Sequence, residues 1–374
     1  MELYNFFIDL FTDYTTQTIG LGTAVLGLMS GVLGVYAILR KQSLLGDAVA
    51  HSALPGIALA FLLTGTKNTL FIFAGAAFAG WLATFWITAI IKNTRIKSDA
   101  ALAIVLSVFF GFGLVLLTFI QRMENANQAG LETYLFGQAA TLLQQDVITM
   151  AGIALFSLIV VVFLWKEFKL FTFDEQFAKT LGFNTRFLDF AINTLIVLAI
   201  VIGLQTVGVI LMSALLIAPA AAARQWTNRL VGVVVLSALF GIISGVVGTG
   251  ISSSGNNLST GPVIVLVSVA IVLISFVFAP GRGWLANFIG KQHNRQSLAE
   301  SKLLDVLYQT CITHQNVKHQ HSLNIIKALP GYNKKALLTL KNDGLIEFTT
   351  ETDWCLTDKG LVKAKKQSGR GGAN

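Results

Sequence analysis

Charged residues are scarce in this sequence. Asp, Glu, Lys and Arg make up 12% of its 374 residues, about half the share that is usual in soluble domains. Such a composition excludes a large soluble enzyme. The few charges are also unevenly placed, because residues 1–280 hold 13 basic and 12 acidic residues, whereas residues 281–374 hold 14 and 7. The chain therefore joins a long apolar part to a basic tail.

The sequence also lacks a cysteine framework, a basic N-terminal segment and a nucleotide-binding motif. Both cysteines, Cys311 and Cys355, lie in the tail without a CxxC partner, which favours reduced cytosolic thiols over disulfides or a zinc ribbon. Residues 1–17 hold three acidic residues and no Lys or Arg, so we expect an extracytoplasmic segment and not a signal peptide. The Gly290–Lys291 pair lacks the rest of a P-loop, so the sequence contains no such phosphate-binding motif.

Long apolar runs fill residues 18–280. A membrane-spanning helix needs about 20 mostly apolar residues, and the runs predict an all-α polytopic membrane protein. Gly27–Gly31 and Gly241–Gly245 have the GxxxG spacing that lets helix backbones approach closely. We count nine spans, or eight if the short sixth and seventh runs form one broken unit. The runs are Thr18–Leu39, Ser43–Leu63, Thr69–Ile91, Ala100–Ile120, Val147–Trp165, Phe187–Gly203, Val207–Ala223, Leu230–Gly250 and Pro262–Ala279.

The distribution of basic residues predicts the orientation. With the N-terminus outside, the inner loops hold eleven Lys and Arg residues, and the outer loops hold only Lys67 and Arg122. Loops rich in Lys and Arg stay in the cytosol. An odd number of spans then places the basic tail in the cytosol.

An Asp and a His lie four residues apart inside the second run. The spacing of Asp47 and His51 puts both side chains on one face of a helix. Ionisable residues inside a membrane are costly and usually face a cavity or a partner, and carboxylate with imidazole suits manganese, iron(II) or zinc. Pro55 leaves the His51 carbonyl without its helical donor and predicts a kink beside the pair. A structural Asp–His hydrogen bond is the alternative, and two ligands do not complete a metal site.

Two further stretches stand out in the apolar part. The sequence FDEQFAKTLGF (residues 173–183) predicts a short amphipathic helix in a cytosolic loop, with Asp174 and Glu175 at its start and Gly182 at its end. An interfacial helix that only caps the bundle is the alternative interpretation. Pro219 predicts a second kink, in a span whose alanines allow close packing.

Four blocks together resemble the permeases of bacterial metal-ion ABC importers, which take up manganese, zinc or iron. They are GDAVAHSALPGIALAF, YLFGQ (Tyr134–Gln138), FDEQFAKTLGF and VGVILMSALLIAPAAAA, and the match covers about residues 18–280. The resemblance implies a bacterial inner-membrane protein and a pore of two identical or paralogous permease subunits. It also implies a cytosolic ATPase dimer and an extracytoplasmic metal-binding protein as partners.

The resemblance gives roles to the residues singled out above. It places Asp47 and His51 in the path of the transported divalent metal ion, with no resident cofactor. It makes residues 174–182 the helix that couples to the ATPase, with contact residues Asp174, Glu175, Ala178 and Gly182. The affinity order of divalent metals favours zinc, whereas the absence of thiols from the membrane part inclines us to manganese.

The tail departs from family members that end near the last span. We expect a linker at 281–299, a winged-helix α+β domain at 300–366 and disorder at 367–374. The predicted order is three helices and a hairpin, and it resembles the DNA-binding domain of metal-dependent repressors. These elements are Glu300–Thr310, His321–Leu329, Asn333–Lys341, and the strands Leu345–Thr349 and Trp354–Thr357.

The third of these helices carries the candidate nucleic-acid contacts Lys334, Lys335 and Lys341. A winged helix reads the major groove with this helix, but here it lacks Arg, the best reader of guanine. We therefore favour a regulatory or assembly module that contacts the ATPase or a symmetry mate, with DNA binding second. A face that meets lipid headgroups is a further alternative.

Two other functions remain open from the sequence. An ion-coupled secondary metal transporter usually has two repeated halves, and no second copy of the Asp47–His51 block is found. A membrane-tethered, metal-responsive regulator would depend on the tail and would not need metal flux.

Overall fold

The computed structural model describes residues 14–66, 69–123, 137, 139, 142–254, 258–280, 283–313, 321–322, 334–348 and 353–368. The chain forms two compact units, Met1–Gly283 and Trp284–Asn374. The expected N-terminal segment 1–17 and the YLFGQ block lie largely outside the described residues, as does the expected disordered end.

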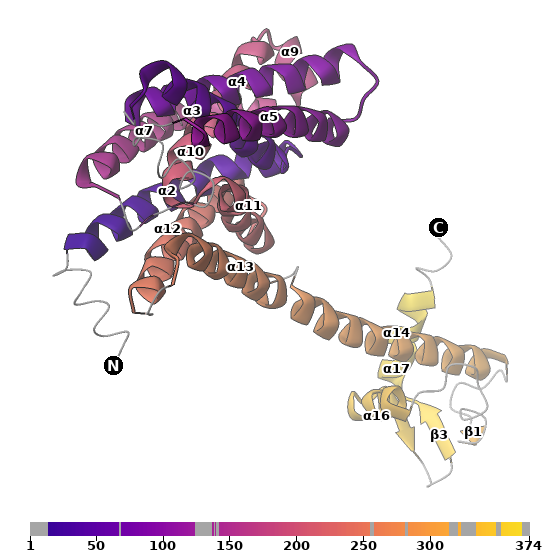
Figure 1. Cartoon of the computed structure of the whole chain (residues 1–374). Helices are drawn as coiled ribbons and strands as arrows, with labels where there is room; N and C mark the ends of the chain where they lie inside the picture. Colours follow the sequence, from indigo (N-terminus) through magenta and orange to yellow (C-terminus); the bar gives the residue numbers. More distant parts are fainter. Residues whose placement is uncertain are drawn as a thin grey trace. The chain divides into compact units, whose positions relative to one another are not determined.

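The first unit is a bundle of long apolar helices (Figure 1). Within the described residues, eight helices are long and apolar enough to cross a membrane, in agreement with the predicted polytopic membrane protein. They are α2 (Tyr14–Leu39), α3 (Leu45–Thr64), α4 (Thr69–Asn93), α5 (Ser98–Gln121), α7 (Gln144–Phe163), α10 (Thr185–Thr206), α12 (Leu230–Ser254) and α13 (Thr260–Phe278).

The expected sixth and seventh runs form two separate helices. α10 extends to Thr206, and α11 (Val209–Trp226) follows after two residues. Gly208 makes this short connection in the left-handed region, with φ 87°, where glycine carries no Cβ penalty. α11 packs against α2, α12 and α13. It contains Pro219 and is not one of the eight helices above, so the count of nine spans stays a prediction.

Helix α2 lies at the centre of the first unit. It packs against α7, α10, α11 and α12, and glycines allow the closest of these approaches. A methyl group on Gly27 would overlap the carbonyl oxygen of Gly241, and one on Gly245 would overlap that of Thr23. The Ser237 hydroxyl adds a buried hydrogen bond of 2.6 Å to the Gly31 carbonyl. The two predicted GxxxG segments therefore pack against each other.

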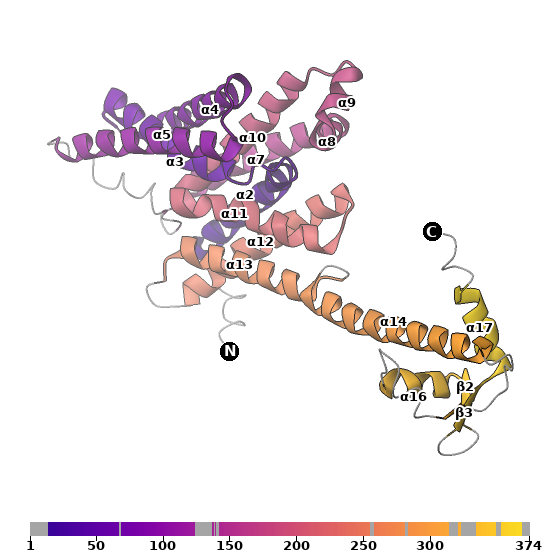
Figure 2. The ribbon, with the colours of Figure 1, turned by 90° about the vertical axis from the view of Figure 1, so that its right-hand side faces the viewer.

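Two short helices connect α7 to α10. They are α8 (Trp165–Phe173) and α9 (Glu175–Thr180), which lie next to each other at one end of the bundle in Figure 2. α8 buries Phe168 and Phe171 in the main core. The cytosolic loop expected between the fifth and sixth runs is therefore helical over most of its length.

The second unit has a small α+β core. α14 (Trp284–Thr313) and α16 (Lys334–Asn342) pack together, and α17 (Asp358–Ser368) packs on α14. The strands β1 (His321–Ser322), β2 (Ile346–Phe348) and β3 (Asp353–Leu356) form an antiparallel sheet in the order β1-β3-β2. The fully buried Trp354 lies in this core with leucines of α14 and α16.

Three expectations for the tail need correction or stay untested. The stretch expected as a polar linker at 281–299 is helical from Trp284, where α14 begins, because its polar residues are good helix formers without proline; its role as a linker stays a prediction. The second helix, expected from His321, begins instead as a strand over His321–Ser322, and residues 323–333 lie outside the described part. The hairpin is confirmed, but a complete winged helix is not shown.

Candidate functional site

Asp47 and His51 lie one turn apart on α3, as their spacing predicts. Asp47 is in the first turn, and its Oδ1 is 3.4 Å from the Nε2 of His51. The His51 side chain is 17% exposed and that of Asp47 is 38% exposed. The Phe110 ring and the imidazole pack nearly perpendicular to each other, with centroids 4.7 Å apart. The pair is thus half-buried, with its carboxylate toward the more open side.

The geometry of this pair suits a shared metal ion. Bonds of about 2.1 Å from one ion to an imidazole nitrogen and to a carboxylate oxygen are normal for zinc. At the observed separation of 3.4 Å, such bonds would meet at about 108°, a normal ligand angle. The other ring nitrogen of His51, Nδ1, is buried and has no hydrogen-bond partner among the described residues. Asp47 therefore contacts one ring nitrogen of His51 and leaves the hydrogen-bonding capacity of the other unused.

Among the described residues, Asp47 and His51 are the two side chains that this site offers as ligands. No group of three or more His, Cys, Asp or Glu side chains that could hold an ion occurs in the described part of the chain. Transition metals take four to six ligands. A bound ion would need its remaining ligands from water, from backbone carbonyls or from another subunit.

Helix α3 continues through Pro55 to Thr64. Proline has no N–H, so the carbonyl of His51 lacks its helical donor. The Pro55 ring also sets the contact with α5, because a Cβ on Gly113 would lie 2.9 Å from the Pro55 Cδ. The glycine allows α5 to approach α3 directly beside the metal-site candidate.

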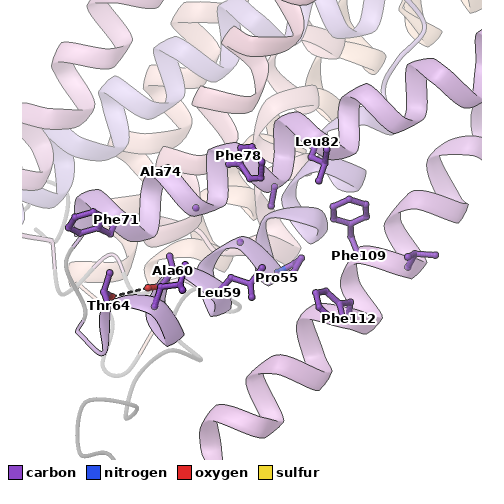
Figure 3. Close-up of a pocket in the computed structure, with 15 residues that line it drawn as sticks. Pro55, Leu59, Ala60, Thr64, Phe71, Ala74, Phe78, Leu82, Phe109 and Phe112 are labelled. Atoms are coloured by element: carbon purple, nitrogen blue, oxygen red, sulfur yellow. Dashed lines mark hydrogen bonds between the residues drawn. The ribbon is translucent and has the colours of Figure 1, made fainter.

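An apolar pocket begins one turn beyond His51. Its volume is about 740 Å³, and side chains of α3, α4 and α5 line it. Figure 3 shows Leu59, Phe78 and Phe112 around this space. The one hydroxyl in the lining, that of Thr64, donates to the Ala60 carbonyl at 2.8 Å. The pocket offers carbon atoms and no free ligand, so it is not a site for an ion.

Helix α9 has the features that the sequence predicts for residues 174–182. Asp174 is its N-cap and accepts a hydrogen bond from the Phe177 backbone N–H at 2.8 Å. Lys179 pairs with Glu175 at 2.6 Å. Gly182 then ends the segment in the left-handed region, with φ 85°.

Two apolar side chains are exposed on and just after α9, among polar ones. Phe177 and Leu181 are both more than half exposed, whereas Ala178 is fully buried. A Cβ on Gly182 would meet no atom within 4 Å. The side chains available to a partner are therefore Phe177 and Leu181, with Glu175 and Lys179 beside them, and Ala178 has a packing role.

An ion pair near α9 was not predicted from the sequence. The guanidinium of Arg40, just after α2, contacts the carboxylate of Asp189 on α10. It also donates to the Asn193 side chain at 3.3 Å and lies 5.0 Å from the centre of the Phe171 ring. The network joins α2, α8 and α10. No local sequence signal joins the two residues, because Arg40 follows the first apolar run and Asp189 lies in the sixth.

The three candidate lysines of the tail lie on α16. Lys334, Lys335 and Lys341 are exposed, and the Lys341 ammonium lies 5.1 Å from the centre of the Phe348 ring.

Pro219 lies within α11, where the Leu216 carbonyl oxygen is so close to Gly34 that a Cβ on this glycine would overlap it. The second predicted kink therefore lies in a tight contact between α11 and α2.

Comparison with known proteins adds to this geometry. A manganese transport system membrane protein, MntC of Bacillus subtilis, is 45% identical over 93% of this chain and 80% of its own length. A zinc transport system membrane protein, TroC of Treponema pallidum, is 51% identical over 74% of this chain and 93% of its own. The solved structure of PsaBC from Streptococcus pneumoniae in complex with Fab matches with a TM-score of 0.67 at 34% identity, over 76% of this chain and 98% of that one.

The two alignments differ in how much of this chain they cover. An alignment that covers 93% of the chain must include most of the second unit, whereas one that covers 74% need not. Residues 12–279, which include α3, α9 and α11, match the model of the ABC 3 transport family. With this match over more than half of its length, and with relatives of 45% and 51% identity, the chain belongs to the ABC 3 transport family.

Proposed function

We propose that the chain is the membrane permease subunit of an ATP-driven importer of divalent transition metal ions. The observation that carries this proposal is the Asp47–His51 pair, 3.4 Å apart on one face of a membrane helix. The names of the manganese and zinc relatives support the class of cargo. The family and these relatives also place ATP hydrolysis on a separate subunit, so the chain itself is not an enzyme.

Manganese is the cargo that we favour, with zinc and iron(II) as the alternatives. The relative that shares most of the tail is named for manganese, and the one with the higher identity is named for zinc. An oxygen and an imidazole nitrogen without a thiol suit manganese. Growth rescue of an uptake-deficient strain in media limited for one metal at a time tests the choice.

The decisive test of transport is substitution of the pair. Asp47→Ala and His51→Ala each remove one of the two ligands that the described residues offer, and each should abolish metal accumulation at unchanged expression and membrane insertion. Ser52→Ala, next in the chain and buried, is the matched control and should retain uptake. Normal accumulation in both pair variants would overturn the assignment.

The orientation that we propose places the N-terminus outside and the second unit in the cytosol. In this proposal α11 is the seventh span in chain order and brings the count from eight to nine. Its 18 residues rise about 27 Å, close to the thickness of the hydrocarbon layer. Nine spans put α8, α9 and Arg224 on the side that the positive-inside rule assigns to the cytosol. Labelling of single cysteines at positions 41 and 122 from outside the cell tests this, and only position 122 should react.

The partners that we propose follow from the exposed surfaces. The apolar face of α9 suits a groove on a cytosolic ATPase dimer, and an extracytoplasmic protein would deliver the metal. A second permease subunit, identical or paralogous, would complete the pore and add ligands to the pair. If uptake persists when the companion ATPase is inactive but ion gradients remain, the chain is instead a secondary transporter.

The second unit is, in our proposal, a winged-helix module that regulates or assembles the transporter. The order α14, β1, α16, β2, β3 and the central place of β3 in the sheet support it. DNA binding through Lys334, Lys335 and Lys341 is the second candidate. Specific, salt-sensitive binding of the protein to its own promoter would favour DNA, and normal metal uptake without the tail would limit the tail to regulation.

A further inference from the structure

A polar cavity of about 510 Å³ lies at the end of the first unit that carries α8 and α9. The last turn of α4 and the first turns of α10 form part of its wall, and the turn after α2 closes it. The apolar pocket of Figure 3 shares none of its lining. The cavity is thus a separate site at a boundary between apolar helices and polar connections.

Both acidic groups of this cavity already have partners. Asp189 is paired with Arg40, and Glu175 is paired with Lys179 at 2.6 Å. Each pair is neutral as a whole. The charge that the cavity offers to a ligand is therefore decided by its other basic residues.

Two further cations line the same cavity. Lys92 and Arg186 are exposed, and neither makes an ion pair with any residue that the structure describes. The cavity therefore keeps two positive charges that no acidic side chain neutralises. An anion with several oxygen atoms, such as a phosphate group, would satisfy both, and Arg186 could bind it through two N–H groups.

The position of the two cations indicates a lipid source for this phosphate. Lys92 lies in the last turn of α4 and Arg186 in the first turn of α10, so both are at the ends of apolar helices. Ile91 and Phe171 add apolar surface to the same cavity, which suits an amphiphile better than a free ion. The exposed Phe177 on α9 is not in this lining, whereas Glu175 and Lys179 are, so the cavity adjoins the surface proposed for the ATPase.

We propose that this cavity binds the headgroup of an anionic phospholipid, with Lys92 and Arg186 as its phosphate ligands. Basic pockets between membrane helices on the cytoplasmic side bind such headgroups. The assignment to the cytosolic leaflet rests on the orientation given under the proposed function. The affinity for the lipid does not depend on which metal is transported.

The test compares two double variants of the full chain, purified in a neutral detergent. Lys92→Gln/Arg186→Gln removes both phosphate ligands, and Arg95→Gln/Lys97→Gln removes two exposed cations from the adjoining connection that do not line the cavity. Binding of dioctanoyl phosphatidylglycerol, dioctanoyl phosphatidylcholine and inorganic phosphate is measured by native mass spectrometry. Each basic residue near the headgroup contributes about fivefold to the affinity. Loss of both should therefore weaken binding of the anionic lipid about thirtyfold.

The expected result is a selective loss. The cavity variant should bind phosphatidylglycerol about thirtyfold more weakly than the wild type, while the control variant and the binding of phosphatidylcholine stay unchanged. An equal loss in both variants would overturn the proposal, because it would reveal diffuse attraction. Binding of inorganic phosphate as tight as that of the lipid would also overturn it, in favour of a soluble anion.

A protein ligand is the remaining outcome. If the cavity variant binds phosphatidylglycerol normally but no longer co-purifies with the ATPase, the two cations serve a protein contact and the lipid proposal is wrong. Metal uptake enters none of these measurements. Failure of the lipid site and failure of the proposed transport function are therefore distinguishable.

Discussion

The ion pair between Arg40 and Asp189 should be one of the most costly single contacts to break in the first unit. The two side chains are only 10% and 19% exposed, so water screens them little. Arg40→Leu would leave the Asp189 carboxylate without its cation, which costs about 3–5 kcal/mol for a buried pair. The same substitution removes the hydrogen bond to Asn193 and the contact with the Phe171 ring.

A double-mutant cycle separates the pair from the general effect of substitution. Replacing both members by leucine leaves no buried charge, and such replacements are often neutral or stabilising. The double variant should therefore recover most of the stability that Arg40→Leu loses. Lys179→Gln is the matched control, because it breaks a pair that is 56% and 52% exposed and should cost about 0–1 kcal/mol.

The assay is unfolding of the purified chain in mixed micelles, followed by fluorescence and circular dichroism. The free energies of unfolding of the four members of the cycle and of the control give the coupling energy directly. Two results would refute the reasoning. One is a cost for Arg40→Leu no larger than that of Lys179→Gln, and the other is a double variant as unstable as the sum of the single ones.

Three further predictions test other parts of the chain. Gly27→Ala should destabilise the bundle by about 1–3 kcal/mol, since its methyl group would overlap the α12 backbone, whereas Gly152→Ala, whose Cβ meets no atom within 4 Å, should unfold like the wild type. Gly182→Trp should uncouple ATP hydrolysis from uptake, whereas Gly182→Ala, which has the same φ strain, should stay coupled. If both variants couple hydrolysis to uptake equally well, α9 only caps the bundle and does not contact the ATPase. Burial, and to a smaller extent Cys355, raises the pKa of the Cys311 thiol. At pH 8 Cys311 should therefore react with iodoacetamide more slowly than Cys355. If the two thiols still react at different rates in denaturant, burial is not the cause.

The sequence was most informative where a pattern has a local cause. The apolar runs predicted the membrane helices, because the length of such a run is fixed by the bilayer. The spacing of Asp47 and His51 predicted their shared face, because helix geometry alone sets it. The N-cap of α9 and the glycine after it were likewise local signals. The GxxxG segments were a step further, since spacing predicts close packing but does not identify the partner helix.

The sequence was least informative where a contact is distant or a segment is polar. Arg40 and Asp189 are 149 residues apart, and neither position reveals the other's presence. α14 runs through a stretch that its polarity marked as a linker, because exposed polar residues form helices as readily as loops. The two-residue strand β1 is held by its pairing with β3. Two residues are too few for an alternation of apolar and polar side chains to be recognised in the sequence.

The incomplete site on α3 is consistent with transport and less so with storage. A structural zinc centre is closed by four protein ligands, whereas the described part of this chain brings together two, with Asp47 on the more open side. An ion that must enter and leave needs a site that is strong enough to select it and weak enough to release it. Ligands that come from water or from a second subunit can be gained and lost as the subunits move. These features support our proposal that the pair is a transient site on the metal path. In that proposal, ligands from a partner subunit would complete the site only in some conformations of the transporter.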